Sequence, residues 1–454
     1  MKRKNFLLVS FLAMAMTFSV ASCSSSSDDP ENIPEIPGGG TETPGGGNDN
    51  PGGNTELTAA QAKQKLDATA QELLGKMNVN DLQEFKTMID GVDYEDGSEV
   101  SKWFEACGDA SVESDSEEGT KYLIKASNFV GEFTLKNGVW KQTKKGGDYL
   151  SFIFNDKNGK NCVLTLKGSS DGTLIHHDCF DDEGGYWDGY KWQEYKDEYR
   201  FILPKKMELT LSRNGEVRAM TTINTEVKTA GEIDLTKDEV EISSVTQIGA
   251  YKVEVNKAAF KAGKNAEAKA VISKDNEKLI TVTASATGNI DNNLEGTYGK
   301  VSASVDILGK AKVVATLSDV NLLIQNLDKA DENDENESLF KQYLENANRL
   351  IDAQLYLDNS SKSCAKVYLA PIEDGYGSYK YWDAEPWLEF SDGSKYSYSD
   401  YFNEKSFKTV VDKVQSIVDS EKSFLHIYLC SIWYIERRVG RNDRHAQSLW
   451  ASDS

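Results

Sequence analysis

The sequence predicts an α+β protein with one large, curved antiparallel β-sheet that is built of hairpins and packed against helices. Three observations predict this class. Asn-Gly pairs at 137/138, 158/159 and 214/215 each stand between stretches of alternating apolar and polar residues, which is the pattern of a β-hairpin. Further period-two stretches continue to about residue 317. Apolar stripes with helical spacing lie at the beginning, the middle and the end of the region after residue 57.

The first helical stripe lies between Thr58 and Asp90. Its apolar residues recur at intervals of three and four, as in Leu66, Ala70, Leu73, Leu74 and Met77. Gly75 and the sequence Asn-Val-Asn-Asp at 78–81 lower the helix propensity. Two helices are therefore expected here, followed by a charged loop.

Hairpins are expected over 133–140, 151–166 and 207–222, each with an Asn-Gly pair in its turn. Residues 301–307 show the alternation most clearly. Four apolar side chains share one face and three polar side chains share the other: Val301, Ala303, Val305 and Ile307 against Ser302, Ser304 and Asp306. Such a strand has one buried and one solvated side. The stretch 257–272 is ambiguous, because its Ala, Lys and Glu also suit a helix.

The second half predicts a helix over 338–351, then hairpins over 353–371 and 387–399, the latter with Asp392-Gly393 at its turn. Residues 399–403 lead into a C-terminal helix. Its apolar stripe consists of Phe407, Val410, Val411, Val414, Ile417 and Val418. This order of elements excludes alternating βαβ units. Open-barrel and tubular lipid-binding proteins have the same outline, which is an analogy of architecture only.

The N-terminus reads as a secretory signal. Three basic residues at 2–4 precede an apolar stretch from Phe6 to Val20, which is shorter than the roughly 20 residues of a membrane-spanning helix. The sequence Val20-Ala21-Ser22-Cys23 resembles the lipobox of bacterial lipoproteins. The resemblance implies that residues 1–22 form the signal peptide and that Cys23 carries the lipid that anchors the mature protein. The alternative is an ordinary signal peptide with a chance cysteine.

The residues after Cys23 bear on localisation. Ser24 to Ser27 with Asp28 and Asp29 resemble the acidic export signal of Bacteroidetes surface lipoproteins. This resemblance implies a lipid anchor in the outer membrane that faces outward, with the periplasmic leaflet as the alternative. Residues 23–56 are acidic and then rich in Pro and Gly, so they are expected to form a tether.

Residues 57–436 are expected to form the globular α+β region, with sub-lobes 57–320 and 321–436 as a finer division. Residues 437–454 differ from the rest, because four of the nine arginines of the chain fall between 437 and 444. Two explanations stay open. Either the tail is simply basic, or a shifted reading frame interrupts the C-terminal helix after about residue 420.

The formal net charge of −22, which becomes −25 without the first 22 residues, argues against nucleic acid as a partner. Five cysteines follow Cys23: Cys107, Cys162, Cys179, Cys364 and Cys430. An odd number cannot pair completely, and the spacing is unlike a dense disulfide framework. Mostly buried free thiols are expected, although a bridge between Cys162 and Cys179 is an option.

Residues 176–183, His-His-Asp-Cys-Phe-Asp-Asp-Glu, form the main local cluster of potential metal ligands. Adjacent histidines on a strand point to opposite faces, and no second cluster completes a site. No metal, cofactor or catalytic residue is therefore predicted. The common hydrolase and nucleotide-binding motifs are absent from the sequence. A glycosidase needs only two suitably spaced carboxylates, so a hydrolase stays a third hypothesis.

Aromatic residues gather at 186–201 and at 376–402. Trp187, Tyr190 and Trp192 lie in a Gly- and acid-rich loop, so they are the candidate ligand-binding residues, because sugar rings stack on aromatic faces. The alternative is packing at the ends of a sheet, which is expected for Trp387, Phe390 and Tyr398.

The leading hypothesis is a non-catalytic surface lipoprotein that binds a glycan or another extracellular ligand. The alternative is a carrier of an apolar or lipid ligand inside the curved sheet, and this alternative predicts an apolar tunnel between the sheet and the helices.

Overall fold

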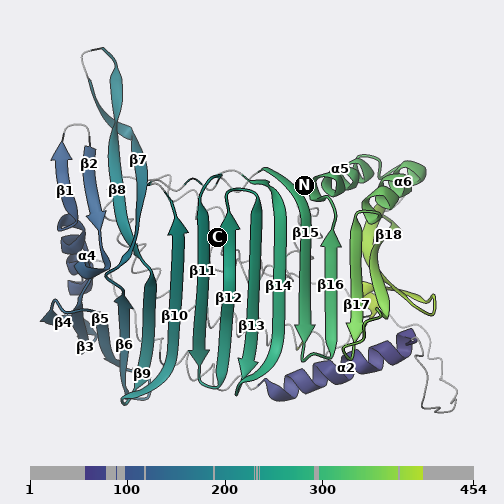
Figure 1. The fold of residues 1–454 in the computed structure, drawn as a ribbon, viewed down its shortest axis with the longest axis horizontal. Coiled ribbons are helices and arrows are strands. Elements are labelled where there is room, and N and C mark those ends of the chain that lie inside the picture. Colours follow the sequence, from purple (N-terminus) through teal and green to yellow (C-terminus); the bar gives the residue numbers. More distant parts are fainter. Residues whose placement is uncertain are drawn as a thin grey trace.

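The computed structural model describes residues 57–77, 88, 98–116, 119–187, 190–229, 231, 234, 236–290, 296–376, 379–401 and 409. The signal segment, Cys23, the tether and residues 437–454 lie outside this set. The described chain is mostly β, with few helices, and contains a sixteen-stranded and a four-stranded sheet (Figure 1). The expected large sheet is thus confirmed. The expected α+β class with a single sheet is not, because the described chain is mostly β and has a second sheet.

The large sheet has the order β20-β19-β18-β17-β16-β15-β14-β13-β12-β11-β10-β9-β6-β5-β3-β4. Its first strands are β3 (Gly131–Lys136), β4 (Val139–Lys145), β5 (Leu150–Asn155), β6 (Asn161–Gly168), β9 (Lys206–Arg213) and β10 (Glu216–Lys228). The central strands are β11 (Glu239–Ile248), β12 (Tyr251–Lys261), β13 (Asn265–Lys274), β14 (Glu277–Ile290), β15 (Gly296–Ile307) and β16 (Ala311–Leu317). The last strands are β17 (Ile351–Leu357), β18 (Ala365–Tyr376), β19 (Tyr379–Phe390) and β20 (Lys395–Ser397).

From β9 to β20 each strand pairs antiparallel with the next strand in the sequence. The ambiguous stretch 257–272 is strand, within β12 and β13. The expectation of a wholly antiparallel sheet is wrong at one pair, because β3 and β5 run parallel. The sheet is not closed into a barrel, and β4 and β20 are its edge strands.

The four-stranded sheet consists of β1 (Val112–Ser116), β2 (Gly119–Ile124), β8 (Trp192–Pro204) and β7 (Gly172–Trp187), in that order. β2 and β8 are parallel. The chain enters this sheet between β6 and β9, which nevertheless pair with each other directly in the large sheet. The β7–β8 hairpin is therefore an insertion in the large sheet.

Two of the three Asn-Gly turns have the geometry that the sequence predicts, whereas in the turn at 158/159 only Gly159 has a positive φ, of 71°. Asn137 and Gly138 have φ values of 52° and 76°, and Asn214 and Gly215 have 52° and 81°. Positive φ at both central residues gives the backbone twist that matches paired strands. The hairpins β3–β4, β5–β6 and β9–β10 are confirmed.

The helices are α2 (Ala59–Lys76), α4 (Glu99–Asp109), α5 (Val320–Asp331), α6 (Glu337–Asn348) and α7 (Tyr398–Tyr401). α2 begins with a capping box between Thr58 and Gln61 and confirms the first predicted helix, as α6 confirms the middle one. α4 and α5 were not predicted. Most of the predicted C-terminal helix lies outside the described residues. No described helix has the length and apolar composition needed to cross a membrane.

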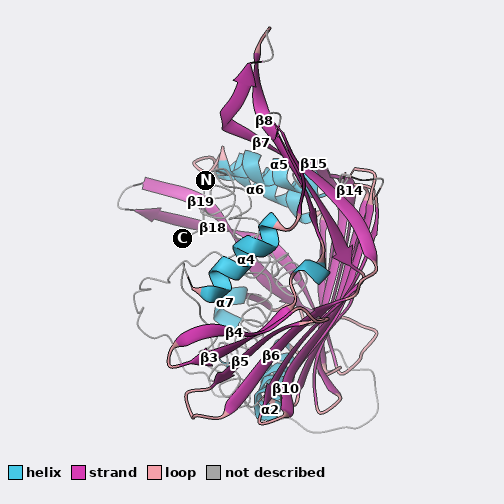
Figure 2. Cartoon of the chain, turned by 90° about the vertical axis from the view of Figure 1, so that its left-hand side faces the viewer, coloured by secondary structure: helices cyan, strands magenta, loops and turns pink. Residues whose placement is uncertain are grey.

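The helices are not distributed evenly over the curved sheet. Figure 2 shows α4, α5, α6 and α7 on its concave side, and Figure 1 shows α2 along the strand ends. The buried core lies on the concave side: Phe104 of α4 belongs to one cluster with Phe133, Phe152 and Leu211. The convex side carries hydroxyl pairs such as Thr283–Ser304, 2.7 Å apart. Residues 301–307 alternate between the two sides as expected, but only Val301 is buried, and the other six residues, apolar and polar alike, are half-buried.

Candidate functional site

The β7–β8 hairpin, here called the arm, projects from the rest of the molecule (Figure 1). Its register runs from Gly172–Pro204 at the base to Trp187–Trp192 at the tip. β2 pairs with β8 only as far as Glu198. Among the described residues, the outer part of the arm is a two-stranded ribbon, so its tip lies away from the core.

Backbone and aromatic contacts hold the base of the arm. The hydroxyl of Thr173 donates to the Val227 carbonyl at 3.3 Å, and the hydroxyl of Thr225 donates to the Pro204 carbonyl at 2.7 Å. The ring of Tyr199, which is buried, stacks on Tyr122 with centroids 4.8 Å apart and planes 2° apart. The arm therefore has a fixed origin.

Charged side chains surround Glu198, which precedes Tyr199 on β8 at the base of the arm. Its carboxylate lies 3.2 Å from Lys121 Nζ and 3.7 Å from His176 Nε2. Arg200 Nε is 3.4 Å away without hydrogen-bond geometry, and the Arg200 guanidinium also pairs with Glu113. Partly exposed pairs of this kind each contribute about 0–1 kcal/mol. They orient the arm but provide no catalytic arrangement.

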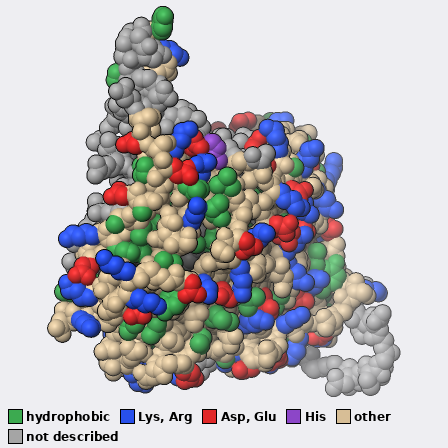
Figure 3. Space-filling view, turned by 60° about the vertical axis from the view of Figure 1, so that its left-hand side comes forward, with side chains coloured by type: hydrophobic (Ala, Val, Ile, Leu, Met, Phe, Trp, Pro, Cys, Tyr) green, Lys and Arg blue, Asp and Glu red, His purple; other side chains and the backbone are tan. Residues whose placement is uncertain are grey.

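Two of the three predicted binding residues are shown at the tip. Tyr190 is 93% exposed and Trp192 is 59% exposed. Trp187 faces Trp192 in the register, and its side chain lies outside what the structure describes. The expected Gly- and acid-rich loop is wrong in form, because strand pairing continues to Trp187–Trp192 and includes a register shift between Asp181 and Gly185. Figure 3 shows hydrophobic side chains at the far end of the arm.

A second feature lies on the concave face. Strand register aligns six alanines side by side across β12 to β17: Ala258, Ala268, Ala284, Ala303, Ala315 and Ala353. We call the surface that they form the alanine trough. Ala353 is buried and the other five are half-buried. The signal was an alanine at an inward position of each successive strand, but it becomes visible only once the register is known.

Larger apolar side chains border the trough and stay partly exposed. Ile242, aligned with Ala258 at one end, is 40% exposed, and Val313, two residues before Ala315, is 38% exposed. α5 packs beyond one side of the trough, where Leu323 contacts the cluster of Val301 and Leu317. α2 packs on the other side of the trough, against the strands at the β17–β19 end of the sheet.

Comparisons with family models, with curated proteins and with solved structures found no match for this chain.

Among the described side chains no group of three His, Cys, Asp or Glu residues could hold a metal ion, and of the cluster at 176–183 only the side chain of His176 is described. His176 contacts Glu198, and the side chains of 177–183 lie outside the described set. Cys107, Cys162 and Cys364 are buried free thiols, as expected for most cysteines. Cys162 therefore does not form the alternative bridge to Cys179.

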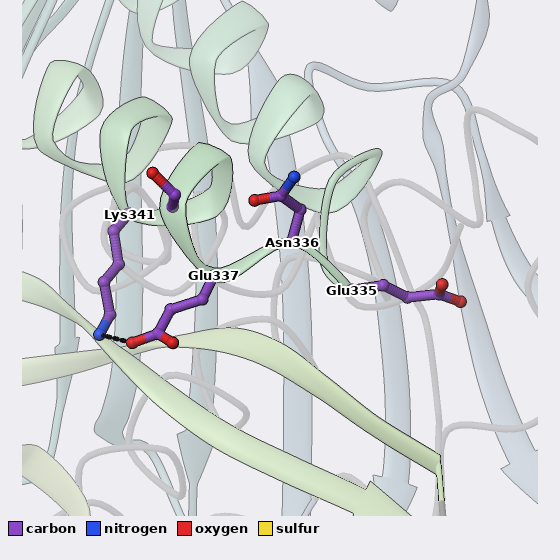
Figure 4. A pocket seen from close by; sticks show the side chains of 5 residues that line it. Glu335, Asn336, Glu337 and Lys341 are labelled. Carbon is purple, nitrogen blue, oxygen red and sulfur yellow. Dashed lines mark hydrogen bonds and ion pairs between the residues drawn. The ribbon is translucent and has the colours of Figure 1, made fainter.

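A polar surface pocket of about 540 Å³ lies at the start of α6 (Figure 4). Its lining consists of Glu335, Asn336, Glu337, Ser338 and Lys341. Three of these groups have structural partners. Asn336 Oδ1 accepts from the Leu339 N–H at 3.2 Å as the helix cap, and Glu337 pairs with Lys341. The pocket is too polar for the apolar tunnel that a lipid carrier predicts.

Proposed function

We propose that the protein is a non-catalytic binding protein of the cell surface, whose arm presents Tyr190 and Trp192 to an extracellular glycan. The observation that carries the proposal is the exposure of two large aromatic side chains at the end of a projecting hairpin. Aromatic side chains normally bury most of their area, and exposed apolar groups on an ordered projection are typical of contact sites.

The chemistry at the tip suits a sugar. An aromatic ring offers a flat apolar face to the C–H groups of a sugar ring. Lys191, which is exposed in the bend between Tyr190 and Trp192, offers hydrogen-bond donors to hydroxyl groups. Binding by a few aromatic contacts on a small surface gives modest affinity per site, which repeated glycan units raise through multivalency.

The proposed location follows from the N-terminus. Lipid on Cys23 would anchor the mature chain in the outer membrane, the acidic residues after it favour the outward face, and the tether up to residue 56 would hold the arm away from the membrane. The anchor and the arm are independent parts of the proposal.

The test uses the mature chain with Cys23→Ser, which cannot be lipidated, on a glycan array and in affinity gels. Tyr190→Ala and Trp192→Ala should each weaken binding about tenfold or more, because loss of one ring–ligand contact costs about 1–3 kcal/mol, as aromatic stacking does on other flat ligands. Val217→Ala is the matched control, since Val217 is 56% exposed beside the β9–β10 turn. Equal binding by all variants would remove the tip from the site.

The second candidate is a carrier of an apolar ligand in an open-barrel or tubular-like sheet. The exposed Ile242 and Val313 beside the alanine trough favour it. It predicts lipid that co-purifies with the protein, detectable by mass spectrometry, and the trough is where such a lipid would bind.

A further inference from the structure

The alanine trough leaves room for the larger apolar side chains of a packed element. Alanine side chains leave space above the sheet that Val, Ile or Phe side chains of a packed element would fill to the usual interior density. Ala284 lies two residues from Val282, which belongs to the buried core cluster on the concave side, so the trough continues the core surface. A continuous apolar surface that is only half-buried therefore needs a covering element.

α7, the last helix that the structure describes, lies near one end of the alanine trough. Tyr401 of α7 is buried, donates its hydroxyl to the Ala59 carbonyl at 3.0 Å, and lies with its ring 5.1 Å from Phe390 on β19. Leu388, on the same strand, aligns through Val367 with Ala353 of the trough. The chain after Tyr401 thus starts next to the β17 end of the alanines.

The sequence that follows has the apolar pattern of a helix that packs on one face. Phe407, Val410, Val411, Val414, Ile417 and Val418 fall on one side of a helix, and Lys405, Lys408, Asp412, Ser416 and Asp419 fall on the other. Thr409, which the structure describes within this stretch, is helical and half-buried.

The lengths place the helix over four of the six alanines. Residues 402–418 as a helix, with a rise of about 1.5 Å per residue, span about 25 Å. Five spacings of about 4.8 Å between neighbouring strands amount to about 24 Å, so a helix that starts beside β19 ends over Ala284 of β14. Counting from Tyr401 beside β19 places Val414 over Ala303 of β15.

We propose that residues 402–418 of the same chain form a helix that docks on the alanine trough, over the alanines from Ala353 to Ala284, and extends the core there. On this proposal the trough is an internal packing surface and not a ligand site. The apolar-carrier function would then have no site there, whereas the arm would be unaffected.

A crosslink tests the docking in the full chain with Cys179→Ser and Cys430→Ser. Ala303→Cys combined with Val414→Cys should form a disulfide within one chain under mild oxidation. The matched control is Ser302→Cys with Val414→Cys, because Ser302 is the next residue on β15 but points to the convex side, where it bonds Thr316 at 3.1 Å. The control pair should not crosslink.

A second measurement follows the labelling of the single variant Ala303→Cys by a maleimide, with the site read by peptide mass. Ala303→Cys should react about tenfold or more slowly than Ser302→Cys. Val414→Asp should restore labelling of Ala303→Cys, whereas Ser416→Asp, on the opposite side of the helix, should not.

Four results would overturn the proposal. These are no crosslink in the Ala303→Cys pair, equal crosslinking in both pairs, a crosslink that joins two chains, or lipid in the purified protein together with labelling of Ala303→Cys that Val414→Asp leaves unchanged. The third result would assign the trough to a second copy and the fourth to a lipid.

Discussion

At the scale of single residues, a buried ion pair holds the turn between β5 and β6. The side chain of Asp156 is fully buried and that of Arg213 is 8% exposed, with Nη1 and Oδ2 3.4 Å apart. Asp156 Oδ1 also accepts from the N–H groups of Asn158 at 2.8 Å and Lys160 at 2.9 Å. The carboxylate thus satisfies three donors at a place where water has no access.

We expect Asp156→Ala to lower the free energy of unfolding by about 3–5 kcal/mol, because it leaves the Arg213 charge buried without its partner. Urea denaturation measures this change. Asp148→Ala is the control, since Asp148 pairs with Lys167 at 3.0 Å on the exposed surface, and it should leave stability nearly unchanged. Similar effects of the two substitutions would show that burial does not matter at Asp156.

Two buried thiols give a pH dependence. Burial raises the pKa of Cys107 to about 12 and that of Cys364 to about 11. An unfolded thiol titrates near pH 8.5, so above that pH the unfolded chain releases protons that the folded chain keeps. The free energy of unfolding should therefore fall as the pH rises from about 8.5 towards 11.

The measurement is urea denaturation at several alkaline pH values, compared with a chain that carries Cys107→Ala and Cys364→Ala. The double variant should lose less stability over this range. An identical pH dependence in both chains would assign the effect to other groups. In the native protein both thiols should also resist iodoacetamide, because the thiolate is the reactive form.

At the scale of elements, the junction of the arm depends on a glycine. A Cβ atom added at Gly172 would lie 2.3 Å from the carbonyl oxygen of Leu203, which is backbone and cannot move away alone. Gly172→Ala should therefore separate the strands at the arm base and speed hydrogen exchange in β7 and β8, with little change in β12 to β16. Gly75→Ala is the control, because nothing lies within 4 Å of that position. Unchanged exchange in the arm would show that the junction is plastic.

The sequence predicts elements well where the signal is local. The three Asn-Gly pairs each mark a hairpin, because a turn depends on a few adjacent residues: two have a positive φ at both residues, and the third has it at Gly159. α5 was missed because Leu322 and Ile324, which are 44% and 38% exposed, add apolar residues outside the buried stripe of Val320 and Leu323. The aromatic tip was predicted by composition, but its projection depends on β2 pairing with the base of β8.

At the scale of the whole molecule, the properties that sequence did not predict are those that depend on distant partners. Three features depend on how strands pair: the parallel β3–β5 pair, the separate four-stranded sheet and the alanine trough. Period-two alternation does not reveal this pairing, because a strand shows the same alternation whether its partner is parallel or antiparallel. The trough shows this most clearly, since six single alanines acquire meaning only when they align. The arm and the trough are separate surfaces, so one can change without the other.

The two ends of the large sheet limit how these molecules associate. An edge strand offers unpaired N–H and C=O groups to any other strand, and a sheet of this width displayed at high density could grow by edge-to-edge addition. β4, at one edge, carries exposed Lys141, Lys144 and Lys145, and β20, at the other, is only three residues long. Addition of a strand at β4 would bring lysine ammonium groups of two chains together, and β20 offers too few backbone groups to hold one. Both edges of the large sheet therefore disfavour edge-to-edge addition, one by charge and the other by length.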